Sequence, residues 1–201
     1  MVETTLRPVS RGAHNRSGIV RAACVALVAA AAILLTSLGS RELAAQEVAT
    51  TMTLTSSAFT EGGRIPAQYT CSGDGISPPL AWSGAPAGTK SFALIVEDPD
   101  APMGTWIHWV VFNIPATAHE LPQAVPSAAR LADGSVQGVG SGAAHQFQGP
   151  CPPSGTHRYY FRIYALDTTL SLPPTARKPA LIDAMKGHIL AEGALMGRFS
   201  R

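Results

Sequence analysis

Two apolar segments on either side of a short polar stretch constrain this chain most. Residues 91–97 (SFALIVE) and 110–114 (VVFNI) are apolar at nearly every position, which predicts two buried strands. The stretch between them, residues 98–109 (DPDAPMGTWIHW), contains Pro99 and Pro102, which lack the N–H that a sheet ladder needs. The chain must therefore leave the sheet in a loop of limited backbone freedom. A rigid loop at a strand end is a frequent place for a functional site.

A basic and then apolar leader precedes the rest of the chain. Four arginines between Arg7 and Arg21 are followed by an uncharged apolar run over residues 22–38. This pattern is typical of a secretory signal, so we expect residues 1–45 to be a signal peptide and the protein to be periplasmic or secreted. The run of 17 residues leaves an uncleaved N-terminal membrane anchor as the alternative. In that case the leader would make the only membrane contact.

The formal net charge of +2 arises in the leader. The leader contains five of the 15 Lys and Arg residues and two of the 13 Asp and Glu residues, so the remaining chain has a net charge of −1. Without a basic patch, that remainder is not expected to bind nucleic acid. It is long enough for one ordinary hydrophobic core.

Two of the three cysteines, Cys71 and Cys151, follow the leader. An exported protein meets an oxidising compartment, so a disulfide between them is the favoured interpretation. The alternative is a pair of buried, unpaired thiols.

The chain after the leader is predicted to form one mainly β domain over residues 52–201, joined to the leader by a tether over residues 46–51. Residues 52–55 (MTLT) alternate as a half-buried strand does. Gly, Pro and Ser are frequent in residues 70–89, which predicts loop with Leu80 and Trp82 as inward anchors. Residues 179–199 place apolar side chains at helical spacing, which predicts a docked C-terminal helix. Residues 138–149 are glycine-rich without a GK[ST] ending, which favours a flexible loop over a nucleotide-binding loop.

Two histidines lie in apolar strand patterns beside proline-containing loops. Strict alternation places His108 on one face with Trp106, Val110, Phe112 and Ile114, and places His157 on one face with Tyr159, Phe161 and Ile163. Either histidine alone is more simply a core side chain bonded to a backbone carbonyl. Two such arrangements in one small domain favour a pocket where Asp98, both histidines and Tyr159 converge. Imidazoles and a phenol are suitable donors to an oxyanion.

Three segments resemble the hallmark segments of the phosphatidylethanolamine-binding protein (PEBP) family. They are residues 98–102 (DPDAP), 106–109 (WIHW) and 149–159 (GPCPPSGTHRY). From about residue 52 to residue 197 the chain is most similar to the bacterial branch, called Raf kinase inhibitor-like proteins. The resemblance implies a large antiparallel sheet packed on a smaller sheet with peripheral helices. It also implies an anion pocket that accepts phosphate-type groups, including phospholipid head groups.

Position by position, the resemblance implies that the pocket comprises Asp98, His108, His157 and Tyr159, shaped by Asp100, Pro102, Trp106, Pro152 and Pro153. We expect Asp98 to orient and charge a histidine or to receive a ligand ammonium, while the histidines and the tyrosine donate to phosphate oxygens. The segment from Gly138 to Gln148 departs from the Asn-x-Phe-Gly and Gly-Tyr pattern of the family, with Phe147 in the place of the tyrosine. The resemblance therefore does not fix the size or identity of the ligand.

Two other functions would use the same region. Asp98, His108 and His157 could form a two-histidine, one-carboxylate metal site of a hydrolase or oxidase. Relatives that inhibit kinases or proteases imply a protein partner instead. No G-x-S-x-G or other convincing catalytic motif is present, so we do not predict an enzyme. The favoured hypothesis is an exported protein that binds a phosphate-containing small molecule or lipid head group without a metal or other cofactor.

Overall fold

The computed structural model describes residues 50–201, so the predicted leader lies outside the described residues. Within residues 50–201, no helix is long and apolar enough to cross a membrane. The first described residues form strand β1 (Thr50–Thr51), which pairs in parallel with a strand near the end of the chain. The last two residues of the predicted tether over 46–51 are therefore part of a sheet, and residues 46–49 lie outside the described part.

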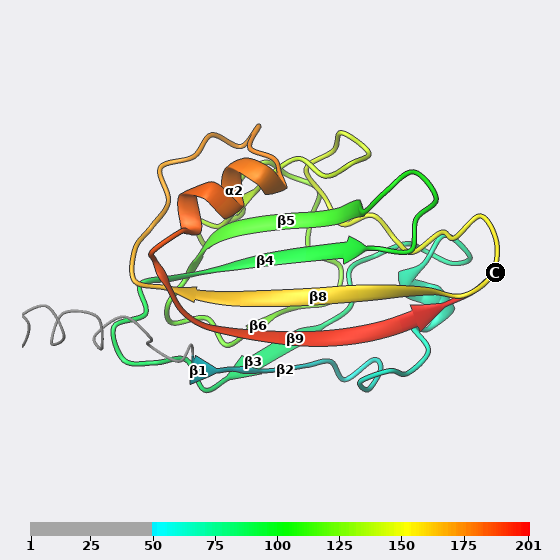
Figure 1. Cartoon of the computed structure of the whole chain (residues 1–201), viewed down its shortest axis with the longest axis horizontal. Helices are drawn as coiled ribbons and strands as arrows, with labels where there is room; N and C mark the ends of the chain where they lie inside the picture. Colours follow the sequence, from blue (N-terminus) through cyan, green and yellow to red (C-terminus); the bar gives the residue numbers. More distant parts are fainter. Residues whose placement is uncertain (1–49) are drawn as a thin grey trace, which may run out of the picture. The chain divides into compact units, whose positions relative to one another are not determined.

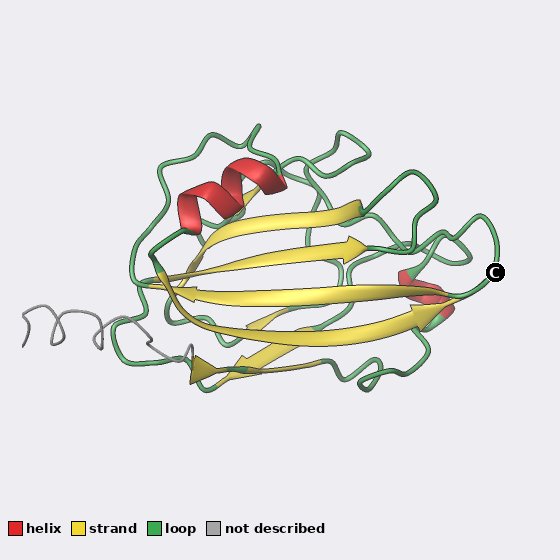
Figure 2. Cartoon of the chain, in the orientation of Figure 1, coloured by secondary structure: helices red, strands yellow, loops and turns green. Residues whose placement is uncertain are grey.

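A six-stranded sheet is the main element of the fold (Figures 1 and 2). Its strands, in spatial order, are β1, β9 (Ile189–Phe199), β8 (His157–Leu166), β4 (Ser91–Asp98), β5 (Trp106–Pro115) and β7 (Val136–Gln137). All neighbouring pairs except β1 and β9 are antiparallel. The two strands predicted from the apolar runs are confirmed as β4 and β5. All eight residues of β4 are buried, because this central strand is covered on both faces.

A three-stranded sheet packs against one face of the large sheet. It consists of β2 (Thr53–Thr55), β3 (Leu80–Ser83) and β6 (Glu120–Leu121). The prediction of loop throughout residues 70–89 is wrong at β3, where Leu80 and Trp82 point inward from a short strand. Four residues between prolines and glycines were too few to show alternation against the turn signals. The predicted fold class, a mainly β protein with a large sheet on a smaller one, is confirmed.

Two hydrophobic cores cover the two faces of the large sheet. The larger core lies between the sheets and contains Leu54, Leu80 and Trp82 from the small sheet with Phe92 and Phe161 from the large one. The second core lies beneath helix α2 (Lys178–Met185), whose Leu181 and Met185 are completely buried. A short 3₁₀ helix, η1 (Ala67–Tyr69), precedes the first cysteine.

The segment predicted as a C-terminal helix is a helix only in its first part. Helix α2 ends at Met185, Gly187 adopts a positive φ of 78°, and the chain then forms the 11-residue strand β9. The alternation of β9 was hidden because two of its inward positions are Gly193 and Gly197. A Cβ at Gly193 would lie 2.6 Å from the Met52 carbonyl oxygen, and one at Gly197 would lie 2.5 Å from Ile65 Cγ1. Close packing therefore requires glycine at these two inward positions, and glycine does not contribute to the hydrophobic alternation that predicts a strand.

Strand β5 does not alternate regularly, because its pairing with β4 shifts register twice, between Phe92 and Leu94 and, at a β-bulge, between Val96 and Glu97. Val96 pairs with Trp109 whereas Glu97 pairs with Ile107, so His108 is the extra residue. As a result, consecutive residues His108 and Trp109 both face the core between the sheets. The single face predicted for His108, Val110, Phe112 and Ile114 is wrong, since Val110 and Phe112 belong to the core beneath α2.

Candidate functional site

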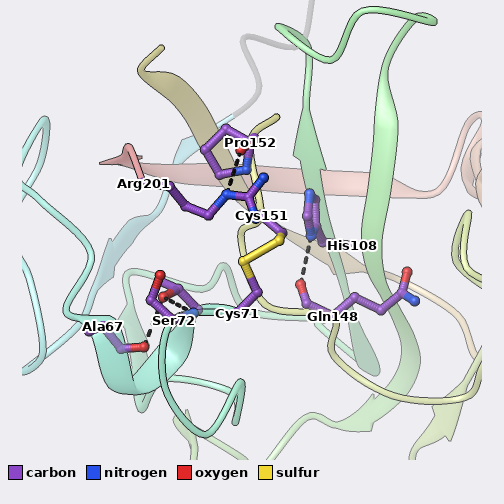
Figure 3. The surroundings of a disulfide bond; sticks show 9 residues. Ala67, Cys71, Ser72, His108, Gln148, Cys151, Pro152 and Arg201 are labelled. Atoms are coloured by element: carbon purple, nitrogen blue, oxygen red, sulfur yellow. Dashed lines mark hydrogen bonds between the residues drawn. A yellow bond between two sulfur atoms is a disulfide. The ribbon is translucent and has the colours of Figure 1, made fainter. Parts of the chain in front are cut away.

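His108 is held at the start of β5 by a backbone oxygen. Its Nδ1 lies 2.6 Å from the carbonyl oxygen of Gln148, and the side chain is almost fully buried. Figure 3 shows the bonded nitrogen turned toward Gln148 and the second ring nitrogen pointing away from it. Burial lowers the pKa of the His108 imidazole, while the Gln148 carbonyl and the Asp98 carboxylate act in the opposite direction.

His157 is held at the start of β8 by a carboxylate. Its Nδ1 lies 2.7 Å from Oδ2 of Asp98, the last residue of β4, and both side chains are buried. The second carboxylate oxygen, Oδ1, accepts the backbone N–H of Asp100 at 2.8 Å. Asp98 therefore orients the histidine and also fixes the start of the proline-containing loop.

Tyr159 lies between the two imidazoles. It follows His157 by two residues in β8, so both side chains are on the same face of the strand. Its ring packs edge-on against His108 at 5.2 Å and nearly parallel to His157 at 6.5 Å between centroids. The hydroxyl is buried and has no hydrogen-bond partner among the described residues. Burial, reinforced by the negative charge of Asp98, raises the pKa of Tyr159, so the phenol stays protonated.

A pocket of about 690 Å³ opens above Asp98 and the two histidines. The proline-containing loop supplies one wall through Pro102 and Met103, together with Trp106 at the start of β5. The segment after Gln148 supplies another wall through Cys151 and Pro153. The remaining lining residues are Ala101, Gly104, Thr105, Ser141, Gln148 and Gly149. No Lys or Arg is among these lining residues. Among these lining residues, positive charge can therefore come only from the imidazoles.

The predicted site residues divide into those that line this pocket and those that do not. Asp98, Pro102, Trp106, His108, Pro153 and His157 line it. Tyr159 lies beneath the lining, completely buried. Asp100 points elsewhere, because its carboxylate accepts hydrogen bonds from Nε and Nη2 of Arg158. Pro152 is buried, and its carbonyl accepts a hydrogen bond from Nε of Arg201 (Figure 3).

Asp100 forms an outer ion pair rather than a pocket wall. Its hydrogen bonds from Arg158 outweigh desolvation and hold the pKa of the carboxyl at about 2. The pair joins the proline-containing loop to β8 beside the pocket. Sequence reasoning placed Asp100 in the correct loop but could not show which way it points.

Comparison with known proteins agrees with this architecture. The sequence model of the phosphatidylethanolamine-binding protein family matches residues 55–200. The chain belongs to this family. A UPF0098 protein of Methanothermobacter thermautotrophicus is 54% identical over 150 residues, which covers 75% of this chain and 99% of that protein.

Two solved structures extend the match to bacterial members of the PEBP family. The putative PEBP homolog CT736 of Chlamydia trachomatis is 43% identical with a TM-score of 0.70, over 76% of this chain and 99% of its own. YbcL of E. coli, described as a member of the mammalian PEBP family, is 33% identical with a TM-score of 0.69, over 75% of this chain and 98% of its own. The chain is thus a ligand-binding protein of the PEBP type.

The predicted disulfide between Cys71 and Cys151 is present (Figure 3). It ties the turn after η1 to the pocket wall, and the Cys71 N–H also donates to the carbonyl oxygen of Pro150 at 3.0 Å. The wall segment runs from Gln148, which holds His108, to His157 itself. The disulfide therefore fixes the segment of the PEBP domain that holds His108 through Gln148 and that leads into His157.

The glycine-rich loop is attached to the pocket rather than free. Phe147 is buried against Trp109 and Phe161 in the main core, and Ser141 exchanges hydrogen bonds with the backbone of Ile107. The Gln148 Oε1 atom accepts the N–H of Gly142 at 3.0 Å. Sequence reasoning missed Ser141 and Gln148 as pocket residues, because the glycine-rich loop carried only a flexibility signal, and it missed Met103 although the predicted loop contains it.

The donor set does not favour the predicted metal alternative. Within residues 50–201, no group of three or more His, Cys, Asp or Glu side chains is arranged to hold a metal ion. Both oxygens of Asp98 already accept hydrogen bonds, one from the N–H of Asp100 and one from Nδ1 of His157. We derive no metal chemistry from this site.

Proposed function

We propose that this protein is exported and binds a phosphate-type anion, either a small molecule or a lipid head group, in the pocket above Asp98, His108 and His157. One observation carries the proposal: two imidazoles, each oriented through Nδ1, line a pocket that contains a carboxylate but no Lys or Arg. Fixed imidazoles are suited to sharing protons with an oxyanion. We propose no catalytic step.

The dimensions of the pocket favour a ligand larger than free phosphate. Its volume of about 690 Å³ lies within the range of sites for small organic ligands. The walls beside the histidines are largely apolar, with Pro102, Met103 and Trp106 on one side. An organic substituent attached to the phosphate would pack against these side chains.

The proposal predicts that anion affinity increases as pH falls through the histidine range. A protonated imidazole supplies both charge and a donor, and burial lowers the pKa of His108, so its charged form needs an acid solution or a bound anion. Calorimetric titration with inorganic phosphate at pH 6 and pH 8 measures this dependence. Affinity that does not change with pH would contradict it.

Substitution separates the pocket histidines from other histidines. His108→Ala and His157→Ala should each weaken phosphate binding by similar factors, about 10- to 100-fold for the loss of a hydrogen bond to a charged group. His188→Ala is the matched control, because His188 is exposed and pairs with Asp167 at 2.8 Å outside the pocket. Unchanged binding in either pocket variant would contradict the proposal. Mass spectrometry of lipids extracted from natively purified protein would then identify the substituent.

Export is supported by the leader sequence together with the disulfide, which is a bond typical of oxidising compartments. Fractionation of cells that express the full chain, followed by N-terminal sequencing, tests both export and cleavage. Recovery in the cytoplasm with Met1 retained would contradict this part of the proposal. Retention in the membrane fraction would indicate the uncleaved anchor.

A protein partner is the second candidate function. Met103 is fully exposed on the proline-containing loop, and Trp106 is 42% exposed at the start of β5; both line the pocket. Apolar side chains exposed together beside a pocket are a common feature of interaction sites. Capture of a partner from periplasmic extract by the wild type, lost in the Met103→Ser/Trp106→Ser variant, would support it; equal capture by both would contradict it.

A further inference from the structure

We propose that the pocket selects a phosphate group that still carries a proton over sulfate and over phosphodiesters, an inference that rests on the function proposed above. The supporting observation is that the Nδ1 atom of each pocket histidine already forms a hydrogen bond within the protein. A backbone carbonyl and a carboxylate can only accept hydrogen bonds, so Nδ1 of His108 and Nδ1 of His157 each bear a hydrogen. In a neutral ring with this tautomer, Nε2 has no hydrogen and acts as an acceptor.

His108 is the imidazole whose surroundings favour the neutral form. The charged or titratable groups that face it are Asp98 on β4 and His157 and Tyr159 on β8, and Gln148 contributes its carbonyl. Desolvation is the largest effect on its pKa and acts against the charge, and a protonated His157 would also oppose it. The free Nε2 of His108 therefore requires a hydrogen-bond donor from the ligand.

The pocket lining thus offers an acceptor at Nε2 of His108, and other lining side chains offer donors. Asp98 adds a carboxylate beside His157. On the rim, Ser141 Oγ accepts the N–H of Ile107, and Gln148 Oε1 accepts the N–H of Gly142. These contacts leave the serine hydroxyl hydrogen and the amide N–H groups of Gln148 for a ligand. A group with both P–OH and P–O⁻ matches this division.

Ligands differ in whether they can supply that hydrogen. A phosphomonoester has a second pKa near 6, so a large fraction of it carries P–OH in mildly acidic solution. A sulfate ester and a phosphodiester carry none at that pH, so they can form a hydrogen bond with Nε2 of His108 only if that imidazole takes a proton from solvent. The pocket should therefore distinguish ligands of nearly equal size and shape by one hydrogen atom.

Phenyl phosphate and phenyl sulfate form the matched pair of probes, and methyl phenyl phosphate is the diester. Calorimetry at pH 6 should give about tenfold or greater preference for phenyl phosphate, the penalty expected for a buried acceptor left without a donor. Titrations in two buffers of different ionisation enthalpy should show proton uptake on binding of phenyl sulfate and the diester, and less uptake for phenyl phosphate.

His108→Gln provides the test within the protein, because its amide N–H₂ can place a donor near the position of Nε2. The preference for phenyl phosphate over phenyl sulfate should then fall to about onefold to threefold. The melting temperature checks that the variant is folded, and the wild-type comparison stands even if it is not. Equal wild-type affinity for both esters, or an unchanged preference in folded His108→Gln, would overturn the inference while leaving the anion pocket intact.

Two further outcomes distinguish a failure of this inference from a failure of the proposed function. Preference for glycerophosphoethanolamine over phenyl phosphate would show that an ammonium group supplies the donor, and it would overturn the inference. Absence of binding for all these probes and for inorganic phosphate would overturn the proposed function itself.

Discussion

The two histidines of the pocket are fixed by the same ring atom but by different kinds of partner. His108 bonds to the backbone carbonyl of Gln148, whereas His157 bonds to the side chain of Asp98. No side-chain substitution can remove a carbonyl acceptor, so the orientation of His108 depends on the fold of the loop that carries Gln148. The orientation of His157 depends on one carboxylate. The two halves of the pocket therefore differ in how they can be disturbed.

Removal of the disulfide should have the largest effect and should act on both halves. Cys71 and Cys151 are 80 residues apart, and closing a loop of that size contributes about 4 kcal/mol to the free energy of unfolding in the chain-entropy model. The Cys71→Ser/Cys151→Ser variant should lose about that amount in urea denaturation and should also bind phosphate more weakly. Wild-type protein treated with a reductant is the control and should behave in the same way. Unchanged stability would show that the wall is held by other contacts.

Asp98→Ala should separate the two histidines by releasing the tautomer of His157 alone. The loss of a buried hydrogen bond between charged or polar partners should lower the free energy of unfolding by about 1.5–3 kcal/mol. Long-range ¹H–¹⁵N correlation spectra of the imidazoles report the tautomer directly. His157 should no longer be held with its hydrogen on Nδ1, while His108 keeps this tautomer through Gln148.

The matched control for Asp98→Ala is Asp183→Ala, because Asp183 is exposed and pairs with Lys186 on the surface. That variant should leave both imidazole signals unchanged. A change of tautomer at His108 in Asp98→Ala would mean that the two halves are coupled more closely than the contacts indicate.

The pH dependence of stability should show the smallest effect. The pKa of His108 is lower in the folded protein than its ordinary value of 6.5, so the unfolded chain binds more protons below that pH. His108 therefore makes the protein lose stability as pH falls below about 6.5, with a slope of at most about 1.4 kcal/mol per pH unit for one proton. Denaturation between pH 7.5 and pH 5 should show a shallower loss in His108→Gln than in the wild type. An identical slope would mean that His108 is charged in the folded protein.

The sequence predicted the fold more completely than the direction of individual side chains. The apolar runs, the hallmark segments and the paired cysteines were sufficient for the two-sheet architecture, the disulfide and the two pocket histidines. Strand β9 was missed because Gly193 and Gly197 occupy inward positions where a Cβ would collide with neighbouring atoms. At both positions, close packing requires glycine, which gives no hydrophobic signal in the sequence.

The pocket rim was the least predictable part, because it depends on long-range contacts. Asp100 lies in the predicted loop but bonds to Arg158, and Gln148 contributes through a backbone oxygen that every residue type possesses. The bulge at His108 is set by the pairing of β4 with β5, and a single strand read by alternation cannot reveal it. These features follow from how strands meet and not from the pattern of any one of them.

The bulge also means that His108 is an extra residue with no pairing partner on β4. Pairing between β4 and β5 is in one register before this residue and in another after it, so a deletion of His108 alone would bring Ile107 and Trp109 into continuous pairing with Glu97 and Val96. The strand would become more regular while the pocket lost an imidazole. At this point the candidate site depends on an inserted residue that the sheet tolerates, and the pairing of this strand would be more regular without it.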